Sequence, residues 1–178
     1  MFDPTIFDNW KVVLEGALYD LDRDGEVEVV GRADTIDLAA MSRSFRLSVR
    51  RPDGSARAEL RLRAGLDDFA GERLGPEASG GDLPGVRLEL ALTLPGERLR
   101  DVGALHDRLR ALWPEETDIV HRARIDIDPL LPPASAADAA NSAYDIRVRP
   151  RRKLGEESLD RIDALTIKLL ETLAAVEP

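Results

Sequence analysis

Three aspartates near the N-terminus have the spacing of the first ligands in a calcium-binding loop. Asp20, Asp22 and Asp24 alternate along the chain, and Gly25 follows with the backbone freedom that a sharp turn requires. Such a loop also needs a bidentate acid eleven residues after its first ligand, and Gly31 occupies that position. We therefore predict a hairpin turn here, with a metal site formed by the three aspartates as the alternative.

The chain has only two histidines, His106 and His121. A shared metal site or an acid–base pair would require the two side chains to meet in space. His106 lies at the edge of an apolar helical stripe, and His121 lies on the apolar face of a strand pattern. We expect each to be a hydrogen-bonded residue at the boundary of the core, and a shared site is the less favoured alternative.

One basic run places five cations among the seven residues from 147 to 153. It comprises Arg147, Arg149, Arg151, Arg152 and Lys153. Such a run can bind a phosphate or another anion. No aromatic residue is interleaved after Tyr144, so stacking on nucleic acid bases has little support. We expect a solvated strand end, with anion binding as the alternative function.

Arginine also recurs on the polar phase of several strand patterns. These residues are Arg46, Arg50, Arg57, Arg61, Arg63, Arg87, Arg122, Arg124, Arg147 and Arg149, and Glu26, Glu28, Glu59, Glu89, Asp126 and Asp145 share their phase. If the strands form one sheet, its open face carries opposite charges, and each cross-strand pair contributes about 0.2–1 kcal/mol. This face either keeps the protein soluble or offers a platform for a protein partner or an anionic ligand.

Length and composition indicate one domain with an aliphatic core. The chain has 178 residues, of which 43% are hydrophobic and only 4% aromatic. Acids outnumber bases by 34 to 25, and the net charge of −9 opposes binding to nucleic acid or to an anionic membrane. The sequence shows no signal-peptide pattern, no bilayer-spanning apolar run and no cysteine. We therefore expect a soluble cytoplasmic protein.

Common catalytic motifs are absent from the sequence. No glycine-rich phosphate loop follows a strand and opens a helix, and no serine lies in a nucleophile-elbow setting. Carboxylates are so abundant that pairs of them carry no information about acid–base catalysis. The sequence therefore assigns no catalytic residue, predicts no cofactor and leaves open whether the protein is an enzyme.

Residues 86–94 hold the clearest strand pattern, because a large aliphatic residue occupies every second position. Similar patterns predict strands at 26–29, 45–49, 58–64, 119–127 and 144–149. A further strand is predicted at 10–21, where β-branched, aromatic and aliphatic residues occupy both faces. Asp-Gly at 24–25 and Pro-Asp-Gly-Ser at 52–55 predict two hairpins. A short helix is expected at 34–41, with Asp34 as its N-cap.

Three segments at the opening of the chain carry a resemblance to known sequences. They are Met1-Phe2-Asp3-Pro4-Thr5-Ile6-Phe7-Asp8-Asn9, Lys11-Val12-Val13-Leu14-Glu15-Gly16 and Tyr19-Asp20-Leu21-Asp22. In these segments the chain resembles an uncharacterised family of small bacterial proteins. The resemblance is limited to the N-terminal quarter and implies no activity, cofactor or catalytic residue.

Two helices are predicted at 97–113 and 156–176, where apolar residues recur with helical spacing. The order of elements predicts a single α+β domain over residues 1–178, with a mainly antiparallel sheet and two helices packed on one face. The second half, β-α-β-β-α, resembles most of a ferredoxin-like unit. Segments 65–85 and 128–143 are predicted to be loops, the first with one helical turn at 66–74.

Two hypotheses of function follow from these patterns. The first is a non-enzymatic protein-interaction module that forms a homodimer, because the apolar stripe of the 156–176 helix is wide enough to be shared with a partner. The second is a small-ligand or anion-binding protein, or a hydrolase, with its site under the 65–85 or the 128–143 loop.

Overall fold

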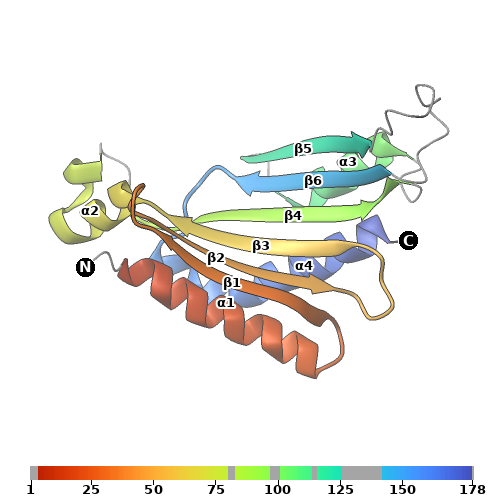
Figure 1. Cartoon of the computed structure of the whole chain (residues 1–178), viewed down its shortest axis with the longest axis horizontal. Coiled ribbons are helices and arrows are strands. Elements are labelled where there is room, and N and C mark those ends of the chain that lie inside the picture. The colour runs from red at the N-terminus through yellow and green to blue at the C-terminus, as the bar shows by residue number, and fades with distance from the viewer. Residues whose placement is uncertain (1–3, 80–82, 97–100, 114–115, 126–141, 178) are drawn as a thin grey trace.

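The computed structural model describes residues 4–79, 83–96, 101–113, 116–125 and 142–177. Its strands form one six-stranded antiparallel sheet in the order β1-β2-β3-β4-β6-β5 (Figure 1). They are β1 (Glu28–Asp37), β2 (Ser42–Arg50), β3 (Arg57–Ala64), β4 (Arg87–Pro95), β5 (Thr117–Ile125) and β6 (Ser142–Pro150). The predicted α+β class with a mainly antiparallel sheet is therefore confirmed.

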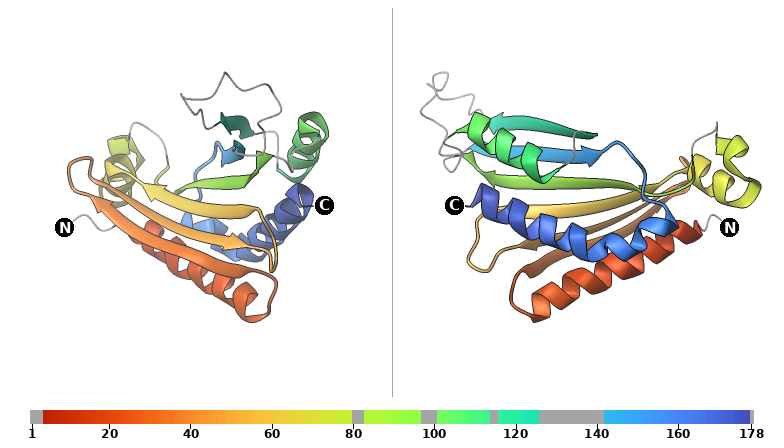
Figure 2. Two further views of the ribbon diagram at one scale, coloured as in Figure 1. Left: turned by 45° about the vertical axis from the view of Figure 1, so that its right-hand side comes forward. Right: turned by 180° about the vertical axis from the view of Figure 1, so that it is seen from behind.

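Three helices lie against one face of the sheet, one more than the sequence predicted (Figures 1 and 2). They are α1 (Thr5–Arg23), α3 (Val102–Leu112) and α4 (Ile162–Val176). The 3-10 helix η4 (Glu156–Arg161) leads directly into α4. Within the described ranges no helix covers the opposite face, which we call the open face. A further helix, α2 (Leu66–Leu74), and the 3-10 helix η1 (Pro76–Ser79) lie together at one end of the molecule (Figure 1).

The core lies between the sheet and these three helices, and β4 is central to it. The leucines of β4 alternate with its polar residues and are at most 4% exposed: Leu88, Leu90, Leu92 and Leu94. Leu14 of α1 and Leu169 of α4 pack into the same cluster and are fully buried. Burying each such side chain contributes about 1.5–3 kcal/mol, so the strict alternation of β4 fixes which face meets the helices.

The second half of the chain has the topology of a split β-α-β unit, as predicted. β4 and β5 run parallel to one another, because both are antiparallel to β6, which lies between them. α3 makes the crossover from β4 to β5, and α4 follows β6. The helices predicted at 97–113 and 156–176 correspond to α3 and to η4 with α4. Asp101 caps α3 by accepting a hydrogen bond from the Ala104 amide at 2.9 Å.

The strand predicted at 10–21 is wrong, because these residues form the middle of helix α1. Four buried residues, Phe7, Trp10, Leu14 and Leu18, recur at intervals of three and four and so share one side of a helix. The predicted hairpin at 24–25 is wrong as well. Gly25 adopts a φ of 75° directly after the helix, and the turn leads from α1 into β1.

The short helix predicted at 34–41 is also wrong, because β1 continues to Asp37. Asp34 points toward α1 and forms ion pairs with Lys11 at 2.5 Å and with Arg43 at 3.2 Å. Arg43 lies 2.8 Å from Asp8 of α1 as well. This partly buried network ties α1 to the edge of the sheet, and the two cations hold the pKa of Asp34 below its usual value despite burial.

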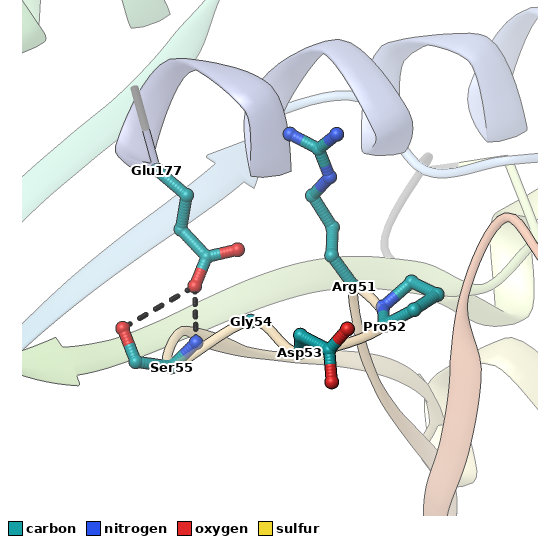
Figure 3. A pocket seen from close by; sticks show the side chains of 6 residues that line it. All are labelled: Arg51, Pro52, Asp53, Gly54, Ser55 and Glu177. Atoms are coloured by element: carbon teal, nitrogen blue, oxygen red, sulfur yellow. Dashed lines mark hydrogen bonds between the residues drawn. The ribbon is translucent and has the colours of Figure 1, made fainter.

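The loop between β2 and β3 is closed by a carboxylate from the end of the chain (Figure 3). Residues Arg51 to Ser55 surround a hollow of about 210 Å³, which Glu177 also lines. The Glu177 carboxylate accepts hydrogen bonds from the Ser55 amide and, at 2.6 Å, from the Ala56 amide. The hollow therefore serves an internal contact, which anchors the chain after α4 to the β2–β3 hairpin.

Candidate functional site

The open face of the sheet carries an excess of positive charge, although the whole chain is acidic. Ten arginines and six carboxylates of the described strands lie on it. They are Arg46, Arg50, Arg57, Arg61, Arg63, Arg87, Arg122, Arg124, Arg147 and Arg149, with Glu28, Asp37, Glu59, Glu89, Asp118 and Asp145. The arginine phase predicted from the sequence is therefore one continuous surface. Glu26 precedes β1, and Asp126 lies outside the described residues.

Part of this charge is paired across the strands. Arg61 lies 2.9 Å from Glu59 and 3.8 Å from Glu89, and Arg149 also contacts Glu89. Arg124 pairs with Asp145 at 2.6 Å, and Arg50 with Glu28 at 2.7 Å. Because these pairs border solvent, each contributes about 0–1 kcal/mol, and their main effect is to hold the arginine side chains in place.

Other open-face arginines have no carboxylate within 4.0 Å among the described residues. They are Arg46, Arg57, Arg63, Arg87, Arg122 and Arg147. The register even places arginines directly opposite one another, as in Arg46↔Arg61, Arg50↔Arg57 and Arg63↔Arg87. Like charges in such positions destabilise a sheet. A face that served solubility alone would be more stable with carboxylates there, so this register favours a binding role.

The open face is hollowed where β3 ends, β4 begins and β6 meets the start of β5. We call this hollow of about 470 Å³ the arginine cleft. Its lining residues are Arg61, Arg63, Arg87, Leu88, Glu89, Asp118, Arg149, Pro150 and Arg151. A second hollow of about 440 Å³ adjoins it and shares Arg87 and Arg151. Five arginines thus converge on one concave surface beside only two carboxylates.

The structure divides the basic run at 147–153 between three environments. Arg147 and Arg149 lie on the open face, and Arg151 forms a two-pronged contact with Asp118 at 3.0 and 2.7 Å. This contact lowers the pKa of Asp118 and raises that of Arg151. Arg152 is exposed and lines the second hollow. Lys153 is nearly buried in an ion pair with Asp68 of α2 at 2.8 Å, so its charge is used inside the fold.

The three aspartates at 20, 22 and 24 do not surround a common point. Asp20 lies 2.9 Å from Arg23, and Asp24 lies 3.7 Å from the same arginine. Asp22 accepts a hydrogen bond from the Val29 amide at 3.2 Å. Asp20 and Asp22 lie in the last turn of α1 and Asp24 is its C-cap, so the three side chains point in different directions. Among the described residues no three histidine or carboxylate side chains group as metal ligands.

The two histidines meet, although the sequence favoured the reading in which they do not share a site. His106 Nδ1 lies 3.0 Å from His121 Nε2, and the centroid of the Tyr144 ring is 5.9 Å from that of His121. α3 packs over β5 and brings the rings together at the border of the core. His121 Nδ1 is buried without a hydrogen-bond partner among the described groups. Burial, followed by the charge of His106, lowers the pKa of His121.

This pair predicts that the protein loses stability when the pH falls below about 6.5, the usual histidine pKa. Because folding lowers the pKa of His121, the unfolded chain binds more protons in this range, which lowers its free energy relative to the native state. Urea denaturation at pH 7.5 and pH 5.5 should show this loss, and His121→Gln should reduce it. An equal loss in the variant would assign the pH dependence to other groups.

The segments expected to cover a ligand site are structured or lie outside the described residues. Within 65–85, Leu66–Leu74 forms all of α2, which is more than the single turn predicted. Glu72 of α2 accepts a hydrogen bond from the Thr5 amide at 2.7 Å, and burial raises its pKa. These contacts attach α2 to the start of α1. Most of the 128–143 segment, residues 128–141, lies outside the described residues.

Sequence reasoning missed the arginine cleft, although part of its signal was present. A hairpin turn centred between residues 53 and 54 fixes the register of β2 against β3. It places Arg50 opposite Arg57 and, four residues further along each strand, Arg46 opposite Arg61. The Arg63↔Arg87 pair has no such signal, because the chain between β3 and β4 contains α2 and η1.

No helix in the described part of the chain is long and apolar enough to cross a membrane. Comparison of the chain with protein-family models, curated proteins and solved structures gives no match. The geometry and the charges of the open face are therefore the main indication of function.

Proposed function

We propose that the protein is a non-enzymatic protein-interaction module whose open face binds an acidic segment of a partner protein. One observation carries this proposal: arginines lie opposite arginines across β2, β3 and β4. At least one arginine of each opposed pair has no carboxylate within 4.0 Å among the described residues. An acidic partner would remove this repulsion when it binds. Complementary charge of this kind speeds association and selects between partners.

The same face favours a protein segment over a nucleic acid. Its described strands present no aromatic side chain for base stacking, because Phe45 and Tyr144 both point into the core. Carboxylates such as Glu89 and Asp145 stand among the arginines and would repel a uniform line of phosphates.

A labelled peptide of alternating Glu and Ser tests the proposal by fluorescence anisotropy. We expect saturable binding that weakens as salt rises, because the contacts are electrostatic. Arg46→Gln combined with Arg57→Gln should weaken it at least roughly tenfold, since two charged contacts of about 1 kcal/mol or more are lost. Arg108→Gln combined with Arg161→Gln removes the same charge from exposed positions on the helical side and serves as the matched control.

Two results would count against an acidic partner on this face. One is equal weakening by both double variants, which would show attraction by net charge alone. The other is equal binding of a peptide of alternating Lys and Ser.

A second copy of the chain is the other partner in our proposal. The dimer was expected from the wide apolar stripe of α4, and the structure uses much of that width internally. Leu169 and Leu173 are fully buried, whereas Ile167 is 56% exposed. Sedimentation velocity distinguishes a dimer formed through α4 from one formed through the open face. A dimer that persists after Ile167→Lys and dissociates after the Arg46 and Arg57 substitutions would place the second copy on the open face.

A further inference from the structure

We propose that the arginine cleft is a binding site for a phosphate monoester. The inference goes beyond the docking of an acidic segment, because it names a separate ligand and a site at one end of the face. Two observations support it: five arginines line one concave surface, and only some of them are paired with a carboxylate.

Three of the five arginines are held in place by carboxylates. Glu89 contacts Arg149 and lies 3.8 Å from Arg61, and Asp118 accepts two hydrogen bonds from Arg151. Glu89 is itself mostly buried, with 15% of its side chain exposed. The two acids therefore fix the walls of the cleft before any ligand arrives, and preorganised donors lose less entropy on binding.

The remaining two arginines supply uncompensated charge. Arg63 and Arg87 are directly opposite in the register of β3 and β4, and neither has a carboxylate within 4.0 Å among the described residues. Directly opposite side chains start about 4.5–5.5 Å apart, so both guanidinium groups can reach one tetrahedral anion. A phosphate monoester carries about 1.5–2 negative charges at pH 7, which matches the two free cations.

The adjoining hollow gives the ligand room for an organic group. It shares Arg87 and Arg151 with the arginine cleft, and one part of its wall is apolar, whereas the rest carries charges of both signs. The apolar part is formed by Ile6, Leu83 and Pro84, and the charged part by Arg152, Lys153, Glu156 and Glu157. A phosphate in the cleft would therefore direct an attached apolar group toward the apolar part of this wall. This arrangement favours an organic phosphate over inorganic phosphate.

The test is an NMR titration of the ¹⁵N-labelled full chain with inorganic phosphate and with phenyl phosphate, at ionic strength held constant with chloride. We expect saturable shifts confined to residues 61–63, 87–89 and 149–151, and tighter binding of phenyl phosphate. Arg63→Gln or Arg87→Gln should weaken binding roughly tenfold, as the loss of one charge-assisted contact implies. Arg87→Lys should restore part of it, because the charge returns without the planar fork.

Arg108→Gln is the matched control, since it removes one exposed positive charge from α3 on the helical side. Equal weakening by this variant, shifts spread evenly over the open face, or a response that does not saturate would overturn the proposal. Circular dichroism on each variant confirms that the fold is retained. A variant that loses its fold is replaced by the lysine substitution at the same position.

The outcome is separable from that of the acidic-segment proposal. Loss of phenyl phosphate binding with retained Glu-Ser peptide binding in Arg63→Gln supports two distinct sites. If the protein binds phosphate but does not bind the Glu-Ser peptide, only the docking proposal is overturned. A phosphoserine-containing peptide that binds more tightly than phenyl phosphate identifies a modified protein as the source of the phosphate, and weaker binding identifies a small molecule.

Discussion

Replacing Lys153 by Met should lower the free energy of unfolding by about 3–5 kcal/mol, because it leaves the carboxylate of Asp68 charged and largely out of water. The Lys153 side chain is only 12% exposed and that of Asp68 only 6%, and their charged atoms are 2.8 Å apart. Asp68 also accepts the Gly65 amide at 2.9 Å, so it is fixed at the start of α2 and cannot turn toward solvent without breaking that contact.

A double-mutant cycle separates the ion pair from the packing of the lysine stem. Asp68→Asn removes the buried charge, so the combination with Lys153→Met should be more stable than the two single effects predict, by at least about 1 kcal/mol. Urea denaturation followed by circular dichroism measures each term. Arg152→Met is the control, because Arg152 is exposed and should change stability by no more than about 0.5 kcal/mol. Additive effects in the cycle would show that the two charges do not depend on each other.

This pair shows why a basic run in a sequence cannot be interpreted as a unit. Val148 is fully buried beside β4, so alternation sends Arg147 and Arg149 to the open face. After Pro150 the strand ends, and the chain turns past α2 toward η4, where Lys153 meets Asp68. The three environments depend on where the strand stops and on which helix lies beside it, and neither can be derived from local charge density.

Most of the sheet could be predicted, because its strands alternate strictly between apolar and polar residues. β4 is the clearest example, and β2, β3, β5 and β6 were also found at nearly their observed positions. The sequence left the strand order open, and the structure places β6 between β4 and β5, the order of the split β-α-β unit that the second half resembles. The register between β3 and β4 could not be predicted, because α2 and η1 separate these strands.

The histidine pair could not be predicted for a related reason. α3 and β5 are neighbours in sequence, and each presents one histidine near its apolar side. Whether the two rings meet depends on the angle at which α3 crosses the sheet and on the position of α3 along the length of β5. A distance of 3.0 Å between the ring nitrogens is therefore a result of tertiary packing, and local periodicity contains no trace of it.

The error at residues 10–21 has a different origin, since the helical signal was present and another pattern masked it. The segment is rich in β-branched, aromatic and aliphatic residues, which is typical of a strand with two apolar faces, and Trp10, Val12 and Leu14 would share one of those faces. Helical spacing selects Phe7, Trp10, Leu14 and Leu18 and leaves Val12 on the other side. Val12 is thus the residue that distinguishes the two interpretations, and it is 67% exposed.

Trp10→Ala should lower the free energy of unfolding by about 3–5 kcal/mol, the usual cost of truncating a buried tryptophan. Trp10 is 2% exposed, and its ring N–H donates to the Gly155 carbonyl at 2.9 Å, which connects α1 to the segment before η4. Circular dichroism is the appropriate probe, because the substitution removes one of only two tryptophans and would alter fluorescence by itself.

Val12→Lys is the matched substitution, because its effect on stability differs most between a helix and a strand at residues 10–21. On the exposed side of α1 a lysine should change the free energy of unfolding by no more than about 0.5 kcal/mol. If residues 10–21 formed a strand, Val12 would lie on the same face as Trp10 and Leu14, and the buried charge would cost at least as much as Trp10→Ala. A severe effect of Val12→Lys would therefore refute the helix. A small effect beside a large one at Trp10 requires the helical side that buries Trp10 in the same core cluster as Phe45 and Leu47 of β2.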